Sequence, residues 1–258
     1  MRSTFPLALT FLTVLPWRGL GQVGPQDLAH SMFWFPWVGL ILGLGFWAGL
    51  GGLQLIFPPA VAAALLLALT VLATRGLHLD GLADTADGLG GGRNPQERLV
   101  VMKDSRLGAF GALSLFLALL LKFTLFLAWA EEGVAPGLIL FPVLSRWGMV
   151  FLAYLSPYAR PEGGLGQAMT TGVSGRVLLG ATLSALVLAL LATGGSGLLL
   201  LAAAAAAVWL VSIFFQKKLG GVTGDVLGAA NEILEILALM GLLLCSHWLP
   251  AISSLQFF

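Results

Sequence analysis

Apolar runs long enough to cross a bilayer recur along nearly the whole chain. A run of about 20 apolar residues makes a helix that spans the hydrocarbon core. Seven such runs lie at 33–56, 58–77, 107–130, 137–155, 177–193, 198–215 and 226–244. Backbone groups in lipid must bond to each other, so these runs must be helical. The sequence therefore predicts an all-α, polytopic transmembrane helix bundle with about seven spanning helices.

The composition agrees with a membrane protein. Of the 258 residues, 58% are hydrophobic and 10% are charged, whereas a soluble domain is about one quarter charged. The net charge of +1 and the lack of a long basic run argue against nucleic acid as a partner. No linker marks a second domain, so we expect residues 1–258 to form one integral-membrane unit. The sequence leaves open whether this unit forms a homo-oligomer.

The N-terminal segment, MRSTFPLALTFLTVLP, differs from the seven runs. One arginine followed by a short apolar stretch resembles a signal peptide, but no small-residue cleavage site follows. The stretch is too short to cross a core of about 30 Å. We expect a short re-entrant or interfacial segment.

The basic residues favour one orientation, because Lys and Arg concentrate in cytoplasmic loops. With 78–106 placed in the cytoplasm, ten basic residues fall on that side and none in an outer loop, Arg2 left aside. The ten are Arg18, Arg75, Arg93, Arg98, Lys103, Arg106, Arg160, Arg176, Lys217 and Lys218. We expect the polar loops, and any active site that they form, to face the cytoplasm.

Residues 78–111 form the densest polar segment. Asp80, Asp84 and Asp87 stand at i, i+4 and i+7, which places them on one helical face. Such carboxylates repel each other unless a cation lies among them, and oxygen ligands favour Mg²⁺ or a similar hard ion. Asp104 either completes a four-carboxylate metal site or pairs with Arg106. His78 is a general base, a residue that orients a ligand, or a polar helix-end residue.

A second polar cluster, KKLGGVTGDVLGAANEILE, covers 217–235. Asp225 and Glu232 are seven residues apart and share one helical face. A carboxylate inside a spanning helix is costly and by default marks a functional site; the alternative is a structural pair with Lys or Arg of a neighbouring helix. We expect Asp225 and Glu232 to join Asp80, Asp84, Asp87 and Asp104 as metal ligands.

Several cations and small residues are candidates for phosphate binding. Arg or Lys side chains neutralise phosphate oxygens, and a helix N-terminus attracts anions. The predicted substrate-binding residues are Arg93, Lys103, Arg146, Arg160, Lys217, Lys218, Gly221 and Thr223. For Arg146, inside a predicted span, a purely structural pair is the alternative. For Lys122, pairing or snorkelling is the expected role.

Five segments in order over most of the chain resemble the cobalamin synthase family, the adenosylcobinamide-GDP ribazoletransferases. They are HLDGLADTADGL, MKDSRLGAFG, SR at 145–146, YARPEGGLG at 158–166, and GGVTGDVLGAANE at 220–232. The resemblance implies a Mg²⁺-dependent enzyme of the bacterial inner membrane. It would join adenosylcobinamide-GDP to α-ribazole or α-ribazole 5′-phosphate and release GMP. It points to Asp80, Asp84, Asp87, Asp104, Arg106, Arg146, Asp225 and Glu232 as site candidates, without dividing them between metal and substrate.

With these substrates, we expect direct displacement at phosphorus by a ribose hydroxyl of the ribazole, with GMP as leaving group. The first three aspartates would hold Mg²⁺. The facing-helix carboxylates, Asp225 and Glu232, would bind a second ion. Arg106, Arg146 and Lys217 would contact phosphate oxygens. The proton acceptor is one of Asp84, Asp87 or His78, with Arg106 as a further catalytic candidate.

Three other functions fit parts of the pattern. A CDP-alcohol phosphotransferase also clusters aspartates, but the fuller pattern of that family is missing here. A lipid pyrophosphatase would use similar chemistry. An ion-coupled transporter would place carboxylates at the bilayer midplane and show a repeat, and this chain does neither.

Overall fold

The computed structural model describes residues 4–133 and 136–248, and every regular element in these ranges is a helix. The elements are α1 (Phe5–Leu12), α2 (Pro25–Ser31), the 3₁₀ helix η1 (Met32–Trp34), α3 (Phe35–Gln54), α4 (Pro59–Ala73), α5 (Leu77–Gly91), α6 (Pro95–Val101), α7 (Ala109–Glu132), the 3₁₀ helix η2 (Pro136–Ile139), α8 (Leu140–Leu155), α9 (Leu165–Gly172), α10 (Gly175–Thr193), α11 (Gly195–Leu219) and α12 (Gly224–Trp248). The predicted all-α architecture is confirmed.

Six helical stretches in the described part are long and apolar enough to cross a membrane. They are Pro25–Gln54, Ala109–Glu132, Pro136–Leu155, Gly175–Thr193, Gly195–Leu219 and Gly224–Ser246. The predicted run 58–77 is not a seventh straight span. It forms α4, of 15 residues, and the chain then bends by 86° into α5. The multi-pass bundle is confirmed, with seven spans only if this broken pair is counted as one.

The bend between α4 and α5 occurs at Arg75 and Gly76. Both have left-handed backbone angles, with φ of 55° and 66°. α5 carries the three aspartates of the first polar cluster and is not among the six spanning stretches. The bend thus directs the polar helix α5 away from the axis of the apolar helix α4.

Helix α8 lies at the centre of the bundle, with thirteen of its sixteen residues buried. Helix α3 approaches α8 and the preceding η2 through glycines: a Cβ atom at Gly39 would lie 2.5 Å from the carbonyl oxygen of Pro142 in α8, and one at Gly43 would lie 2.2 Å from that of Ile139 in η2. Small residues at fourfold spacing allow such backbone contact between membrane helices. By contrast, α7 exposes an apolar outer face that includes Leu113 and Phe116, as expected for lipid contact.

Helix α1 has only eight residues and packs against α2 and α3. The backbone N–H of Val14, just after α1, donates to the carbonyl oxygen of Ala73 at 2.8 Å. The N-terminal segment is therefore a short helix held against the end of α4. Its re-entrant or interfacial placement stays a prediction.

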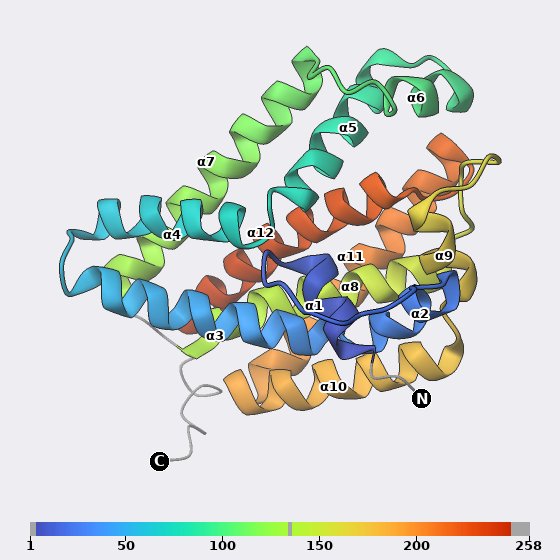
Figure 1. Cartoon of the computed structure of the whole chain (residues 1–258). Coiled ribbons are helices and arrows are strands. Elements are labelled where there is room, and N and C mark those ends of the chain that lie inside the picture. The colour runs from blue at the N-terminus through green and yellow to red at the C-terminus, as the bar shows by residue number, and fades with distance from the viewer. Residues whose placement is uncertain (1–3, 134–135, 249–258) are drawn as a thin grey trace.

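Most connections with basic residues gather at one end of the bundle. Helices α2, α6 and α9 lie at this end, on the right in Figure 1, while the α3–α4 connection and the α10–α11 turn lie at the other. This separation agrees with the orientation expected from Lys and Arg.

Candidate active site

Helices α5 and α12 pack with their backbones in close contact. A Cβ atom at Gly81 of α5 would lie 2.7 Å from the carbonyl oxygen of Asp225, and one at Gly228 would lie 3.3 Å from the Cα atom of His78. At Gly81 the obstacle is backbone, so only glycine permits the approach. Asp80 adjoins Gly81 and Asp84 lies one turn further along α5. The two polar clusters of the sequence therefore meet at this contact.

Asp84 lies where negative charges gather. Partial burial and the charges of Asp80 and Asp225 raise the pKa of the Asp84 carboxyl to about 6. Asp225 is compensated, because Nη2 of Arg160 lies 2.7 Å from its Oδ2. Within the described ranges, the carboxylates of Asp80 and Asp84 form no hydrogen bond or ion pair. Uncompensated carboxylates are expected where a cation or substrate binds.

A cavity of about 590 Å³ opens beside Asp80 and Asp84. Its size falls in the range of small-molecule sites, roughly 300–1,000 Å³. Other walls are apolar and come from Phe11 of α1 and from Leu115 and Leu119 of α7. The cavity therefore joins a carboxylate pair to an apolar surface.

Asp87 has a different neighbourhood from Asp80, although both lie on one face of α5. Seven residues cover about 10 Å along a helix, too far for both carboxylates to bind one ion. The oxygens of Asp87 accept the backbone N–H groups of Gly108 and Gly111, each at 2.8 Å. Asp87 thus caps the N-terminus of α7, where the helix dipole favours a negative charge.

Glycines make this cap fit. A Cβ atom at Gly108 or Gly111 would lie 2.4 Å or 2.3 Å from an Asp87 oxygen. The segment RLGAFG therefore places small residues where the carboxylate approaches the backbone. Its effect is to fix the start of α7 against α5, beside the cavity.

Asp104 and Arg106 lie in the loop before α7 and pair with each other. Nη2 of Arg106 lies 2.5 Å from Oδ2 of Asp104, and this pairing lowers the pKa of Asp104 to about 2. Of the two roles left open by the sequence, the structure shows the pair. Lys103 forms an exposed ion pair with Glu162 of the loop before α9.

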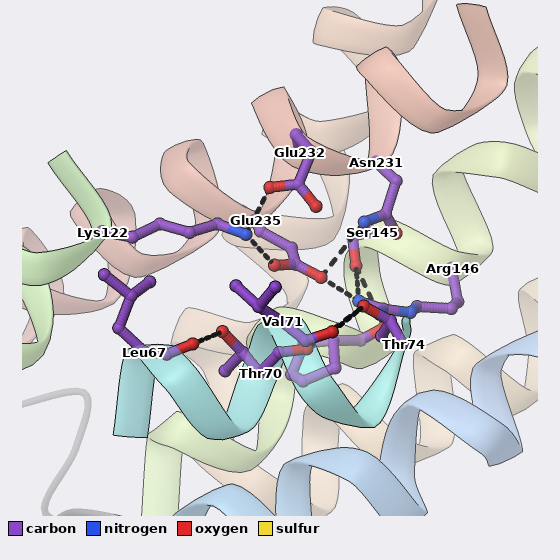
Figure 2. Close-up of polar contacts among 11 residues, drawn as sticks. Leu67, Thr70, Val71, Thr74, Lys122, Ser145, Arg146, Asn231, Glu232 and Glu235 are labelled. Carbon is purple, nitrogen blue, oxygen red and sulfur yellow. Dashed lines mark hydrogen bonds and ion pairs between the residues drawn. The ribbon is translucent and has the colours of Figure 1, made fainter. Parts of the chain in front are cut away.

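A second group of charges lies deep in the bundle (Figure 2). Nζ of Lys122 on α7 lies 2.5 Å from Oε2 of both Glu232 and Glu235 on α12. Arg146 of α8 also donates to Glu235, which accepts a further hydrogen bond from Asn231 at 3.1 Å. All five side chains are buried. Two cations balance two carboxylates, which makes burial of the four charges tolerable.

This buried network gives Glu232 and Arg146 the structural pairing that the sequence had left as an alternative, and it confirms pairing for Lys122. Glu232 follows Asp225 by seven residues and so lies about 10 Å further along α12. Neither Glu232 nor Arg146 lines the cavity that Asp80 and Asp84 line.

His78 is also withdrawn from that cavity. Its side chain is 1% exposed, and neither ring nitrogen has a hydrogen-bond partner in the described part of the chain. It lies on the α5 face that packs against α12, near Gly228. His78 is not among the residues that line the cavity.

The last turn of α11 and the turn between α11 and α12 contain four predicted substrate-binding residues. Oγ1 of Thr223 accepts the N–H of Val226 at 3.2 Å in the first turn of α12. A Cβ atom at Gly221 would lie 2.3 Å from the carbonyl oxygen of Pro157. These two residues shape the turn that positions Asp225. Lys217 and Lys218 are exposed, as is Arg93 in the loop after α5.

Comparison with known proteins decides the family. The family model described as cobalamin-5-phosphate synthase matches residues 4–243. The chain belongs to this family. The resemblance seen in the five segments is thereby confirmed.

Curated relatives match nearly end to end, and each of the following is named adenosylcobinamide-GDP ribazoletransferase. The protein of Syntrophobacter fumaroxidans is 46% identical over 241 residues, which cover 93% of this chain and 97% of the relative. That of Desulfitobacterium hafniense is 42% identical over 239 residues, 91% and 94% of the two chains. That of Pseudomonas fluorescens is 43% identical over 248 residues, 93% and 98%. No solved structure matches.

Of the six predicted metal ligands, only Asp80 and Asp84 remain available to bind Mg²⁺. No three His, Cys, Asp or Glu side chains in residues 4–133 and 136–248 are grouped so that they could hold a metal ion. Four of the six predicted ligands have protein partners: Asp87, Asp104, Asp225 and Glu232. Asp80 and Asp84 keep their oxygens for the cavity. Mg²⁺ commonly uses one or two carboxylates together with substrate phosphates and water, so this pair suits it.

Two residues with evident roles were not among the predicted site residues. Glu235 binds both cations of the buried network, and its position three residues after Glu232 on one helix face was a usable signal. Arg75 was counted only as a loop cation, yet it lines the cavity. That placement follows from the break between α4 and α5, which the apolar pattern does not reveal.

Proposed function

We propose that this protein is a membrane-bound adenosylcobinamide-GDP ribazoletransferase of the bacterial cell inner membrane. It joins adenosylcobinamide-GDP to α-ribazole, or to α-ribazole 5′-phosphate, giving adenosylcobalamin or its 5′-phosphate with release of GMP. Family membership and the names of relatives at 42–46% identity support this reaction. The observation that carries the site assignment is the cavity in which Asp80 and Asp84 lie unpaired, beside the start of α12.

The cytoplasmic side is the proposed location of this cavity. It opens where α5, the 102–108 loop and the end of α4 meet, and α5 leads from there to α6, which lies at the end of the bundle that carries the basic loops (Figure 1). A surplus of Lys and Arg marks cytoplasmic loops. It also favours approach of an anionic, GDP-linked substrate.

The proposed chemistry is a direct displacement at phosphorus. A ribose hydroxyl oxygen of the ribazole forms a bond to the cobinamide-side phosphorus, and the bond from that phosphorus to the GMP oxygen breaks. The hydroxyl proton passes to Asp84. This residue lines the cavity, and in the described part of the chain its carboxylate has no hydrogen bond or ion pair, so an oxygen is available to accept the proton.

The other two candidates for the proton acceptor are less suited. Both oxygens of Asp87 already accept N–H groups of α7. His78 is buried outside the cavity. Geometry therefore favours Asp84.

The remaining residues of the site position these groups. Asp80, with one oxygen of Asp84, would hold Mg²⁺, which when bound offsets negative charge on the pyrophosphate and on departing GMP. Arg160 holds Asp225 at the α5–α12 contact. The cap formed by Asp87 fixes α7, whose leucines close the apolar wall of the cavity.

The test is an assay of GMP release by the purified protein in lipid nanodiscs. We expect GMP only when adenosylcobinamide-GDP and α-ribazole, or its 5′-phosphate, are both present. A transporter would release none, and a CDP-alcohol phosphotransferase or lipid pyrophosphatase would ignore the corrinoid. EDTA should abolish release and added Mg²⁺ should restore it. Folded protein that yields no GMP under these conditions would contradict the proposal.

A further inference from the structure

The cavity beside Asp80 and Asp84 has one cationic residue among the described residues that line it. This residue is Arg75, at the junction of α4 and α5. Two carboxylates and one guanidinium therefore share the cavity. None of the cations predicted to bind phosphate lines it.

The guanidinium of Arg75 has donors to spare. Its Nη2 donates to the carbonyl oxygen of Thr13 at 3.0 Å. In the described part of the chain it forms no ion pair with a carboxylate, whereas Arg106, Arg146 and Arg160 each do. An arginine has five N–H donors in a planar fork that matches phosphate oxygens. Arg75 thus keeps most of its donors for another partner.

The backbone of Arg75 is held in an unfavourable conformation. Its φ is 55°, and it is the one non-glycine residue of the described chain with a positive φ. A glycine would adopt this angle without steric cost, as Gly76 does next to it at 66°. Strained non-glycine residues cluster at functional sites, where the side chain is required.

From this combination we propose that Arg75 binds a phosphoryl group of a substrate in the cavity. The inference rests on the proposed function, which supplies phosphorylated substrates. An anion that enters beside Asp80 and Asp84 is repelled by both, and a guanidinium on the cavity wall offsets this repulsion together with any bound metal. Two sources carry the required group: the pyrophosphate of adenosylcobinamide-GDP and the phosphate of α-ribazole 5′-phosphate.

A purely structural role is the competing explanation, because Arg75 also contacts the segment after α1. That segment has a second anchor, the hydrogen bond from Val14 to Ala73. The contact to Thr13 needs one donor and no charge. Variants of Arg75 can therefore separate anchoring from phosphate binding.

Three variants and one control make the test. Arg75→Gly relaxes the backbone and removes the guanidinium, Arg75→Gln keeps a donor without the charge, and Arg75→Lys keeps the charge without the fork. The control is Arg176→Gln, at an exposed arginine of α10 outside the cavity. For each protein in nanodiscs, KM and kcat for GMP release are measured with each substrate varied, together with the melting temperature.

We expect KM to rise roughly tenfold or more in Arg75→Gly and Arg75→Gln, and less in Arg75→Lys, because one charge-assisted contact is lost. Melting temperatures should not fall. A KM increase for adenosylcobinamide-GDP identifies the pyrophosphate as the bound group. An increase for α-ribazole 5′-phosphate but not for α-ribazole identifies the monophosphate. Arg176→Gln should match the wild type.

Unchanged KM values in Arg75→Gly and Arg75→Gln would overturn the inference, whether or not their melting temperatures fall. If the wild type releases no GMP, the proposed function fails and the inference is tested by calorimetric titration with inorganic pyrophosphate and Mg²⁺. Roughly tenfold weaker binding to Arg75→Gln than to wild type would support the role of Arg75. Equal binding, or no binding to either protein, would overturn it.

Discussion

Carboxylates of α5 and α12 look alike in the sequence but have opposite surroundings. Asp80 and Asp84 of α5 lie unpaired at a cavity, whereas Glu232 and Glu235 of α12 are buried and bound by Lys122 and, at Glu235, by Arg146 as well (Figure 2). Burial of a charge is tolerable only with a partner. Carboxylates without a partner are left where water, a cation or a substrate reaches them. The paired group holds helices together, and the unpaired group is available for chemistry.

Breaking the buried network should have the largest effect on stability. In Lys122→Met, Glu232 loses its cation and Glu235 keeps only Arg146, so we expect a loss of about 3–5 kcal/mol. The measurement is thermal unfolding in detergent, with the yield of folded protein as a second readout. In Lys122→Met/Glu232→Gln, the removal of one unpaired charge should recover part of the loss. A melting temperature equal to that of the wild type would show that the network does not hold α7 and α12 together.

Separating α5 from α12 should cost less stability but much of the activity. In Gly81→Ala, the new methyl group meets the Asp225 backbone at 2.7 Å, and such overpacking costs about 1–3 kcal/mol. GMP release and thermal unfolding are measured together. The matched control is Gly45→Ala on α3, where a Cβ atom meets nothing within 4 Å; it should unfold at or above the wild-type temperature. Full activity in Gly81→Ala would show that the close contact does not position the site.

Removing the cap of α7 should have a smaller effect on stability. Asp87→Ala leaves the N–H groups of Gly108 and Gly111 without their acceptor, at a cost of about 0.5–2 kcal/mol. Asp87→Asn retains an acceptor oxygen and should lie between Asp87→Ala and the wild type in melting temperature. If Asp87 acted only on the substrate, both variants would lose activity without a change in melting temperature.

Asp84→Asn should show no loss of stability at all, since it relieves repulsion from Asp80 and Asp225. GMP release should nevertheless fall by about 10²–10⁴-fold, because the proton acceptor and a proposed metal ligand are lost. Lys122→Met should unfold at a lower temperature than the wild type, whereas Asp84→Asn should be folded but inactive. This contrast separates the two groups of carboxylates most clearly. Wild-type activity in Asp84→Asn would remove Asp84 from the mechanism.

Most of the fold was predictable from the apolar runs, because lipid permits few structures other than helices. The bend after α4 was not. It depends on left-handed angles at Arg75 and Gly76, and the hydropathy of the run 58–77 does not report these backbone angles. A left-handed arginine leaves no trace in hydropathy. The cavity that forms at this bend was unpredictable for the same reason.

The site was predictable in part. Helical spacing correctly placed Asp80, Asp84 and Asp87 on one face, and the contact at Gly81 brings Asp225 to them. Spacing alone does not reveal what approaches that face from elsewhere in the chain. Asp87 accepts hydrogen bonds from the start of α7, and Glu232 forms an ion pair with Lys122. These partners lie 21 to 110 residues away in the sequence, beyond the reach of any local pattern.

The most direct test of the central claim is an anomalous-diffraction map from crystals soaked with Mn²⁺, a hard ion that can stand in for Mg²⁺. The claim is that the unpaired carboxylates of α5 form the metal-binding catalytic cavity. It predicts an anomalous peak at about 2.0–2.3 Å from oxygens of both Asp80 and Asp84. A peak at Glu232 and Glu235 instead, or no peak in protein that is active with Mn²⁺, would contradict it.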